Sequence, residues 1–338
     1  MSSTPKLAWM IGLRRHQLKM HQWAAAALLA GLVGAHPAQA AWPSDQPIEV
    51  FVGFAAGGTT DVMIRTLAPY IAKQLGEGAT LVIVNKPGAS GEISVVQTAR
   101  ARPNGYAIGI VNNPGYFFVP MMRKAAYATT DLTLVARIVS DPTVMVTRKD
   151  GKLADLKSVV AQLKAQPGSL TAGHNGMGTN GHLAMLHLEK SAGLKFNAIP
   201  YNGSAQQKTA LAGSQLDIAF LAASEVPDPD NEATPMRLLA QFTKQKVTRL
   251  NSVPTTYELG FAVEMLAERG IAAPNGMPAA ILARLQKAIE SAMKDPDYIR
   301  AATNDAPFLN YAAGAEWKLL IEQDRKAYED IARTLPKD

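Results

Sequence analysis

The feature that most constrains the fold is an alternation of strand-like and helix-like segments along most of the chain. Short apolar runs, of which Ile48–Phe54 is the clearest, predict buried strands. Amphipathic stretches of helical period, such as Val62–Leu75, lie between many of them. Strands that alternate with helical segments of about ten residues are typical of βαβ units and mainly parallel sheets. The chain is therefore predicted to belong to the α/β class.

The same two patterns recur further along the chain. Other predicted strands are Thr80–Val84, Tyr106–Val111, Val144–Thr147, Ser169–Ala172, Asn197–Pro200, Asp217–Leu221 and Arg237–Phe242. Other predicted helices are Glu92–Ala101, Leu153–Lys164, Asn180–Ser191, Ser204–Leu211, Pro278–Met293 and Ala315–Leu335. Pro69 lies inside Val62–Leu75 and is expected to kink that helix or shift its start. The polar stretch Glu225–Thr234 is expected to be a surface loop.

Two stretches are candidate crossings between domains, Ser140–Pro142 and Gly260–Pro274. If the chain crosses at both, residues 141–264 form one lobe, and residues 41–140 join residues 265–338 in the other. About 300 residues follow the first 40, which suits two domains of ordinary size. Two crossing segments between two α/β lobes make a hinge, and closure of a hinge around a ligand is a recurring arrangement.

Residues 1–40 have the three parts of an export signal: a basic start, the apolar stretch Trp23–Ala35, and the small-residue motif Ala38–Ala40. The apolar part is shorter than the roughly 20 residues that span a bilayer, which favours cleavage near Ala41 over an uncleaved anchor. Leu13–Lys19 resembles a twin-arginine signal, so the general and the twin-arginine export routes both stay open. Either route predicts a periplasmic protein.

Composition narrows the chemistry of the exported part. The chain has no cysteine, which excludes a disulfide, a thiol nucleophile, a cysteine metal site and a lipid anchor at the cleavage point. Four of the 34 basic residues lie in the first 40 and none of the 28 acidic ones does, so the remainder has a net charge of only +2. Nucleic acid is therefore not an expected partner, and no membrane-embedded segment is expected after cleavage.

The clearest candidate binding motif follows the first predicted strand. Gly57 and Gly58 form a tight turn, and Thr59, Thr60 and Asp61 open a helix. A helix N-terminus offers free backbone N–H groups and the positive end of the helix dipole, which together favour an anion. The threonine hydroxyls can donate to a carboxylate. Asp61 has the wrong charge for that role and is expected to cap the helix or hold the loop.

Similar junctions occur further along the chain. Gly178, Thr179 and Asn180 predict a second helix N-terminus with polar donors, and two such ends facing one cleft would clamp an anion. Asp217, which begins a strand, could face the cleft or form a turn. The residues expected to shape loops are Gly57, Asp61, Gly88, Gly91, His182 and Tyr201.

Motifs for catalysis are missing. No lysine follows the glycines as in a P-loop, and the spacing of a dinucleotide site is absent. No G-x-S-x-G nucleophile elbow occurs. The spacing of His182 and His187 does not suit a helical zinc pair. These observations favour binding over catalysis, and we expect no catalytic residues, no metal and no cofactor.

Taken together, the motifs resemble one family, the periplasmic receptors of tripartite tricarboxylate transporters, also called Bug receptors. The resemblance covers nearly the whole exported chain. The matching pieces, in order, are Trp42-Pro43, Pro47-Ile48, Gly57-Gly58 with Asp61, Asn85 with Pro87-Gly88-Ala89 and Gly91, Gly105-Tyr106, Gly176 with Gly178-Thr179 and His182-Leu183, Pro200-Tyr201 with Gly203, Val253-Pro254-Thr255 with Glu258 and Gly260, and Ala273-Pro274 with Gly276 and Pro278. Asn104 departs from the family's usual Asp, and Gly213 to Asp217 matches loosely.

The resemblance implies a two-lobed periplasmic binding protein, a type II-like Venus flytrap that holds a small organic acid between its lobes and delivers it to membrane permease subunits. One ligand carboxylate would contact the loop Phe54–Thr60 through backbone amides. A loop with Thr179 and Asn180 would contact the ligand from the other side. To these we add Asn112 and Asn113, because they end the predicted strand Tyr106–Val111. The candidate ligand-binding residues are then Phe54, Ala56, Gly58, Thr59, Thr60, Asn112, Asn113, Gly178, Thr179, Asn180 and Asp217. The family site needs no arginine. Two alternatives stay open: a subunit that presents its ligand to a membrane sensor kinase, and a periplasmic α/β enzyme.

Overall fold

The computed structural model describes residues 42–76, 78–231 and 233–333. The predicted export signal, residues 1–40, lies outside the described residues. In the described part of the chain, no helix is both long enough and apolar enough to span a membrane.

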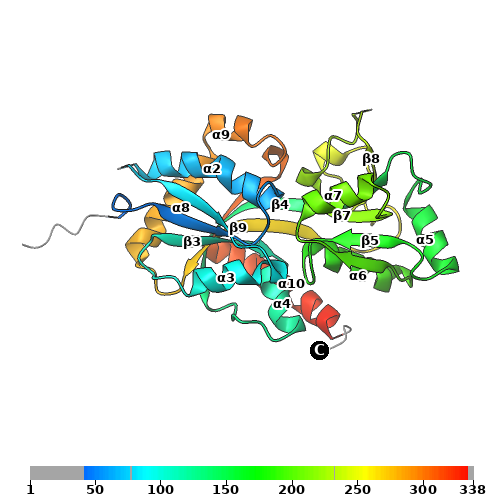
Figure 1. The fold of residues 1–338 in the computed structure, drawn as a ribbon, viewed down its shortest axis with the longest axis horizontal. Coiled ribbons are helices and arrows are strands. Elements are labelled where there is room, and N and C mark those ends of the chain that lie inside the picture. The colour runs from blue at the N-terminus through cyan, green and yellow to red at the C-terminus, as the bar shows by residue number, and fades with distance from the viewer. Residues whose placement is uncertain (1–41, 77, 232, 334–338) are drawn as a thin grey trace, which may run out of the picture. The chain divides into compact units, whose positions relative to one another are not determined.

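Strands and helices alternate through most of the described chain (Figure 1). The strands are β1 (Ile48–Val52), β2 (Leu81–Asn85), β3 (Ala107–Asn113), β4 (Leu132–Arg148), β5 (Thr171–His174), β6 (Asn197–Pro200), β7 (Ile218–Ala222), β8 (Met236–Gln241), β9 (Leu266–Pro274) and β10 (Leu309–Ala313). The α-helices are α2 (Thr59–Leu75), α3 (Glu92–Ala99), α4 (Gly115–Met122), α5 (Leu156–Ala165), α6 (Asn180–Ala192), α7 (Ser204–Ala212), α8 (Ala279–Met293), α9 (Pro296–Ala301) and α10 (Gly314–Ala332). Short 3₁₀ turns are η1 (Ala89–Gly91), η2 (Ala223–Glu225), η3 (Thr248–Leu250) and η4 (Ala306–Phe308).

Two groups of strands share the long strand β4. In the first lobe, β1 pairs in parallel with β2 and β3, and β9 joins β3 to β4 by antiparallel pairing. In the second lobe, β5 pairs in parallel with β6 and β7, and β4 pairs antiparallel with β7 and β8. β10 adds to β4 on the side of the first lobe. The prediction of an α/β fold with two lobes is confirmed, although antiparallel pairs occupy the centre.

The two crossings between the lobes are strands. We expected breaks at Ser140–Pro142 and Gly260–Pro274, but the first lies within β4, and β9 occupies Leu266–Pro274 of the second. β4 and β9 pair with each other at the crossing, Ser140 opposite Glu268 and Pro142 opposite Leu266. Just beyond, from Thr143 onward, β4 pairs with β7 instead. The connection between the lobes is therefore a two-stranded antiparallel ribbon.

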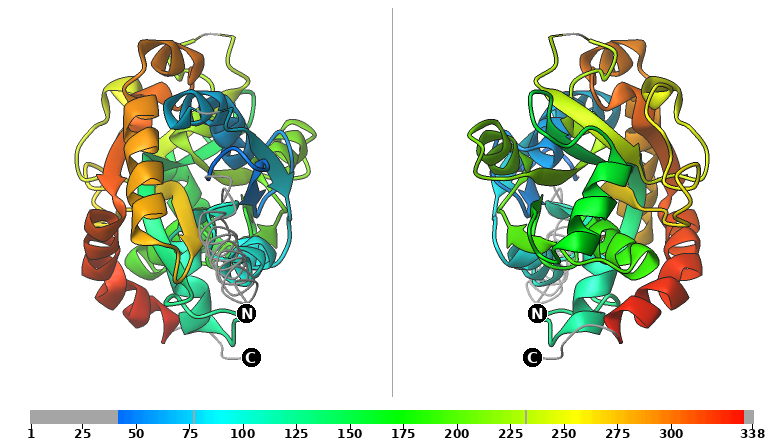
Figure 2. Two further views of the ribbon diagram at one scale, coloured as in Figure 1. Left: turned by 90° about the vertical axis from the view of Figure 1, so that its left-hand side faces the viewer. Right: turned by 90° about the vertical axis from the view of Figure 1, so that its right-hand side faces the viewer.

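Helices cover both faces of the sheet in the first lobe (Figures 1 and 2). On one face, α2 and α8 pack side by side over β1, β3 and β9 through residues that include Ile64, Leu67 and Ile289. On the other face, α3, α4 and α10 enclose Tyr116 and the fully buried Trp317. The covered sheet explains the apolar residues of β1, in which Glu49 is the one exposed position.

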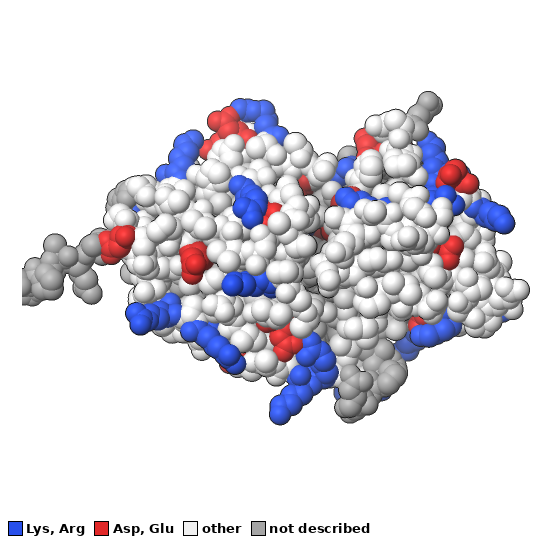
Figure 3. All heavy atoms as spheres, viewed as in Figure 1, with Lys and Arg blue, Asp and Glu red and all other residues white. Residues whose placement is uncertain are grey.

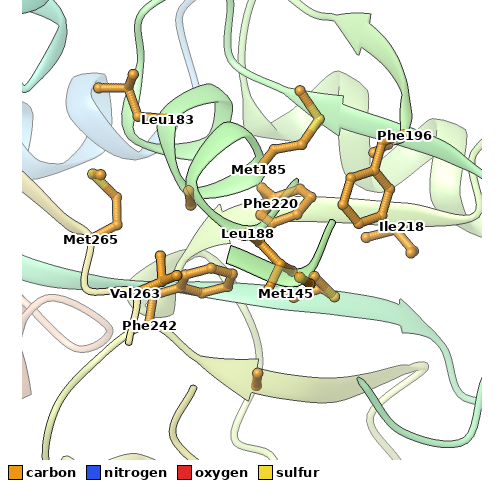
Figure 4. Close-up of a cluster of buried hydrophobic side chains, with 14 of the residues drawn as sticks. Met145, Leu183, Met185, Leu188, Phe196, Ile218, Phe220, Phe242, Val263 and Met265 are labelled. Carbon is orange, nitrogen blue, oxygen red and sulfur yellow. The ribbon is translucent and has the colours of Figure 1, made fainter. Parts of the chain in front are cut away.

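The second lobe has the same layered arrangement. The helix α6 packs its apolar side on β4 and β7, where Leu183, Leu188, Met145 and Phe220 form one cluster (Figure 4). On the opposite face, α7 packs against the sheet through Leu211. The end of α10 also joins the Figure 4 cluster, so the C-terminal helix contacts the second lobe as well. Helices therefore cover both faces of this group of strands as well.

Among the strands and α-helices of the described chain, α4, α9, β9 and β10 were not predicted, and of β4 only Val144–Thr147 was. Pro69 lies inside α2 without shifting its start, because α2 begins ten residues earlier, at Thr59. On the face drawn in Figure 3, basic and acidic side chains lie scattered, with both signs mixed. That face therefore carries no single-sign patch of the kind that binds nucleic acid.

Candidate binding site

A cavity lies between the two lobes, at the ends of strands from both. The empty space between its lining atoms is about 750 Å³, with open solvent at its mouth included. The lining residues come from the first lobe (Phe54, Ala55, Ala56, Gly58, Thr59, Thr60, Ser90, Asn112, Asn113, Gly115, Ala267, Arg269) and from the second (Asn175, Thr179, Asn180, Gly203, Ser204, Ala205, Gln206, Ala222, Glu225).

On the first lobe, the N-terminus of α2 opens toward the cavity. α2 begins after Gly58, and no side chain caps it. Asp61 holds the preceding turn from behind: its carboxylate accepts the Gly57 N–H at 2.9 Å and pairs with Arg65 at 2.9 Å. Burial alone would raise the pKa of the Asp61 carboxyl, but the bonds from Arg65, Gly57 and Asn85 outweigh it and lower that pKa. Asp61 therefore stays charged and fixes the turn that precedes α2.

The adjacent strand β3 adds two amides. Asn112 Nδ2 donates to Thr60 Oγ1 at 3.0 Å, and Asn113 Nδ2 donates to Glu268 Oε2 at 3.0 Å. Both asparagines line the cavity. The bond from Asn112 orients the Thr60 hydroxyl, so that the position of one cavity-lining group depends on the other.

On the second lobe, the N-terminus of α6 faces the same cavity. Thr179 is the N-cap residue, and its hydroxyl donates to Gly176 O at 2.7 Å rather than capping the helix. Asn180 Nδ2 donates to Thr143 Oγ1 at 2.9 Å. Below this loop, His182 Nδ1 accepts the Gly178 N–H at 3.0 Å. The N–H groups of the first turn of α6 are therefore presented by a loop that hydrogen bonds hold rigidly.

The histidine under this loop is neutral. His182 is 3% exposed, and its ring lies 4.6 Å from that of His174, centroid to centroid. Burial, and then the nearby His174 and Lys195, lowers the pKa of His182 to about 3. Because its Nδ1 accepts a hydrogen bond, the neutral ring carries its proton on Nε2. His182 therefore positions the loop and is not available as a ligand for a metal.

A third helix N-terminus reaches the cavity from α7. α7 begins after Gly203 without a side-chain cap, and Gly203, Ser204 and Ala205 all line the cavity. Ser204 Oγ lies 3.5 Å from Thr59 Oγ1, so the starts of α7 and α2 meet across the cleft. Three uncapped helix N-termini, from both lobes, thus converge on one cavity, which is an environment that stabilises negative charge.

Two charged residues also line the cavity, Arg269 on β9 and Glu225 in η2. Arg269 is 3% exposed, and its Nη2 contacts Asp141 at 2.7 Å, Asp305 at 3.1 Å and Ser224 Oγ at 3.1 Å. Burial raises the pKa of Asp141 to about 7, against the opposing effects of Arg269 and Ser224. Glu225 Oε1 accepts the Thr59 hydroxyl at 2.9 Å.

Most of the residues proposed from the sequence come together here. Phe54, Ala56, Gly58, Thr59, Thr60, Asn112, Asn113, Thr179 and Asn180 line the cavity. Gly178 lies just outside the lining, with its N–H on His182. Asp217 is also outside, because it precedes β7 whereas the cavity lies at the other end of that strand, at Ala222, about 16 Å away for five residues. The Asp217 carboxylate instead accepts bonds from the N–H and hydroxyl of Thr171.

The residues expected to shape loops lie around the cavity. Gly57, Gly88 and Gly91 adopt positive φ, at 76°, 127° and 92°, which glycine adopts without steric cost. Tyr201 follows β6, and its N–H donates to His174 O at 2.9 Å. The bends at these positions set where Phe54, Ser90 and Asn175 stand at the cavity.

Sequence reasoning missed Arg269, Glu225, Ser204 and Asn175. Ser204 carries the same signal as Thr59, a hydroxyl residue that opens a helix after glycine, and could have been found. Glu225 was assigned to a surface loop, and Arg269 to a break between domains, so both assignments are corrected. Although the family resemblance required no arginine, Arg269 stands in the lining. Among the described residues, no group of three or more His, Asp or Glu side chains is placed to hold a metal ion.

The two-lobed fold, with helix N-termini from both lobes around one cavity, is that of the solute-binding proteins. The model of the tripartite tricarboxylate transporter family receptors (TctC) matches residues 63–332. The UPF0065 protein in the gbd 5′ region of Cupriavidus necator is 32% identical over 288 residues, 84% of this chain and 86% of that protein. The chain therefore belongs to the TctC, or Bug, receptor family.

Solved structures agree in fold. The periplasmic binding protein BugD has 25% sequence identity and a TM-score of 0.78 over 86% of this chain and 97% of that one. An R. palustris protein solved with adipate has 24% identity and a TM-score of 0.79 over 87% of this chain and 98% of that one. The described lobes thus have the architecture of known periplasmic binding proteins.

Proposed function

We propose that the chain is a periplasmic receptor that captures a small carboxylate-bearing organic acid between its lobes and delivers it to a tripartite tricarboxylate-type permease. One observation carries the proposal: the uncapped N-termini of α2, α6 and α7 meet at one cavity. Family membership supports delivery to a permease, and the adipate found in a relative of the same fold supports the ligand class. Export of residues 41–338 to the periplasm is part of the proposal.

A carboxylate in the cavity would favour the closed form. Each charge-assisted hydrogen bond from a helix N-terminus contributes about 1.5–3 kcal/mol when well formed. Because those donors come from both lobes, the ligand makes its full set of bonds only when the lobes are together, and binding shifts the population toward closure. We propose residues 41–140 with 265–338, and residues 141–264, as the two moving bodies. The closed surface is then what the permease recognises.

The proposal assigns no catalytic step to the cavity. The ligand contacts come from backbone N–H groups around Phe54, Ala56, Gly58 and Thr59, from the Thr60 hydroxyl, and from the amides of Asn112 and Asn113. The Thr59 hydroxyl donates to Glu225 and can offer a ligand only an acceptor. Gly178, Thr179 and Asn180 supply the opposite wall, through the loop that positions α6. His182 and His174 are buried and neutral, and neither lines the cavity. This arrangement holds an anion without presenting it to a nucleophile.

The test is the thermal shift that carboxylates produce. Succinate, adipate and benzoate are added to the purified chain, and we expect at least one to raise the melting temperature. Thr179→Val removes the hydroxyl that holds Gly176 O, so the N–H groups of α6 lose their support and much of the rise disappears. Thr209→Val makes the same chemical change on the exposed side of α7 and keeps the rise. An undiminished rise in Thr179→Val would exclude this loop from the site.

A further inference from the structure

Glu225 brings a negative charge into a cavity whose other polar lining groups are hydroxyls, amides, backbone N–H groups and the Arg269 guanidinium. Glu225 is the last residue of η2, which directly follows β7, and its carboxylate accepts hydrogen bonds from both lobes. Oε1 accepts the Thr59 hydroxyl of the first lobe at 2.9 Å, and Oε2 accepts the Ala222 N–H of its own lobe at 2.8 Å. Glu225 is the one acidic residue in the lining of this cavity.

The cations near Glu225 make no hydrogen bond to its carboxylate among the described residues. Arg269 directs Nη2 to Asp141, Asp305 and Ser224, and its buried Nε has no hydrogen-bond partner in the described part of the chain. Lys208 Nζ donates to the main-chain oxygen of Glu225 at 3.1 Å, not to its carboxylate. Arg249 likewise bonds main-chain oxygens of the same segment. Among the described residues, no ion pair includes the Glu225 carboxylate.

A carboxylate accepts hydrogen bonds and donates none. Each Glu225 oxygen has one protein donor, so further acceptor sites on it remain for a ligand in the cavity. A ligand group placed opposite Glu225 must therefore donate, and a protonated nitrogen does so with complementary charge. A second ligand carboxylate at that wall would meet a like charge in a partly enclosed space, which disfavours binding.

We propose that the ligand is zwitterionic: its carboxylate lies on the helix N-termini, and its protonated nitrogen donates to Glu225. This inference rests on the proposed function and narrows it, from organic acids in general to amino acids and related amino carboxylates. It separates this receptor from those that select plain dicarboxylates. Glu225 would act as the determinant of that selectivity, with Thr59 holding its carboxylate in place.

The experiment compares probes of equal chain length by isothermal titration calorimetry. Succinate is paired with 4-aminobutyrate, and glutarate with 5-aminopentanoate and with L-glutamate. We expect at least one amino carboxylate to bind about tenfold or more tightly than the dicarboxylate of the same length, since one charge-assisted bond replaces a repulsion. Glu225→Gln removes the charge while keeping size, and should reduce the preference at least tenfold.

Two control variants separate charge from geometry. Glu264→Gln makes the same charge change on the second lobe outside the cavity, at a residue that pairs with Lys244, and should leave the preference unchanged. Thr59→Val breaks the bond to Oε1 but keeps the charge, and should weaken both probe classes together. The unfolding temperatures of Glu225→Gln and of the parent chain are also measured without probe, so that a misfolded variant is recognised.

The outcomes distinguish the inference from the function on which it rests. Equal or tighter binding of the dicarboxylates, or a preference that Glu225→Gln leaves intact, overturns the inference while the carboxylate receptor stands. Binding of neither probe class removes the proposed function and the inference with it. An amino-carboxylate preference that is lost only in Glu225→Gln supports both.

Discussion

The neutral His182 makes the stability of the second lobe depend on pH in a way that can be isolated by one substitution. Its Nδ1 accepts the Gly178 N–H, and burial lowers its pKa to about 3. In the unfolded chain the same imidazole has a pKa near 6.5. Below pH 6.5 the unfolded chain therefore takes up a proton that the folded chain excludes, and the stability from the neutral ring is lost as the pH falls toward 3.

The magnitude follows from the two pKa values. At pH 5, protonation of the imidazole favours the unfolded chain by roughly 1.5 pK units. At 1.36 kcal/mol per unit, this lowers the free energy of unfolding by about 2 kcal/mol. At pH 7.5 the same effect is close to zero. His182→Asn places an amide oxygen near the position of Nδ1, so it keeps an acceptor for Gly178 while it removes the titrating group. The variant should lack this part of the acid sensitivity.

Urea denaturation at pH 7.5 and pH 5 measures the effect. The loss of unfolding free energy between the two pH values should be about 2 kcal/mol larger for the parent chain than for His182→Asn. Burial raises the pKa of Asp141, which acts in the opposite direction over the same range, but it is present in both proteins and cancels in the difference. Parallel pH dependences of the two proteins would refute the assignment of a buried neutral ring.

Two further substitutions test the packing that holds the cleft. Arg269→Met leaves Asp141 and Asp305 buried without their cation, and should lower the unfolding free energy by about 3–5 kcal/mol in urea titrations. A loss below about 1 kcal/mol would contradict the buried ion pairs. Gly181→Ala places a Cβ 2.8 Å from Phe220 O, so α6 must shift from β7; we expect a cost of about 1–3 kcal/mol and a smaller carboxylate thermal shift, and unchanged values of both would contradict the close approach.

Much of the fold was predictable because its signals are local. The apolar run of β1 and the helical period of α2 appear in consecutive residues, and so does the glycine turn between them. β9 was missed because Leu266–Pro274 has no alternation of apolar and polar residues, and its pairing with β3 and β4 comes from distant parts of the chain. At Gly270 a Cβ would stand 2.4 Å from the Trp317 ring, a constraint that only the folded chain reveals.

The residues of the binding site also divide into those with a local sequence signal and those without one. Thr59 and Thr179 could be proposed because glycine followed by a hydroxyl residue marks the start of a helix. Arg269 and Glu225 reach the cavity only through long-range pairing of β9 and through the turn after β7, and no local pattern indicates either. Asp217 carried a suitable side chain but stands at the wrong end of its strand. Strand direction decided the outcome, and strand direction was not assigned from the sequence.

The antiparallel ribbon of β4 and β9 has a mechanical consequence. Two separate loops would let the lobes slide, tilt and rotate almost independently, whereas two hydrogen-bonded strands resist sliding. A slip of one residue would break the hydrogen bonds between the strands and turn side chains to the opposite face. The motions that such a ribbon permits most easily are a twist about its length and a bend across it. The proposed closure of the lobes would therefore be a rotation of one lobe against the other, not a slide.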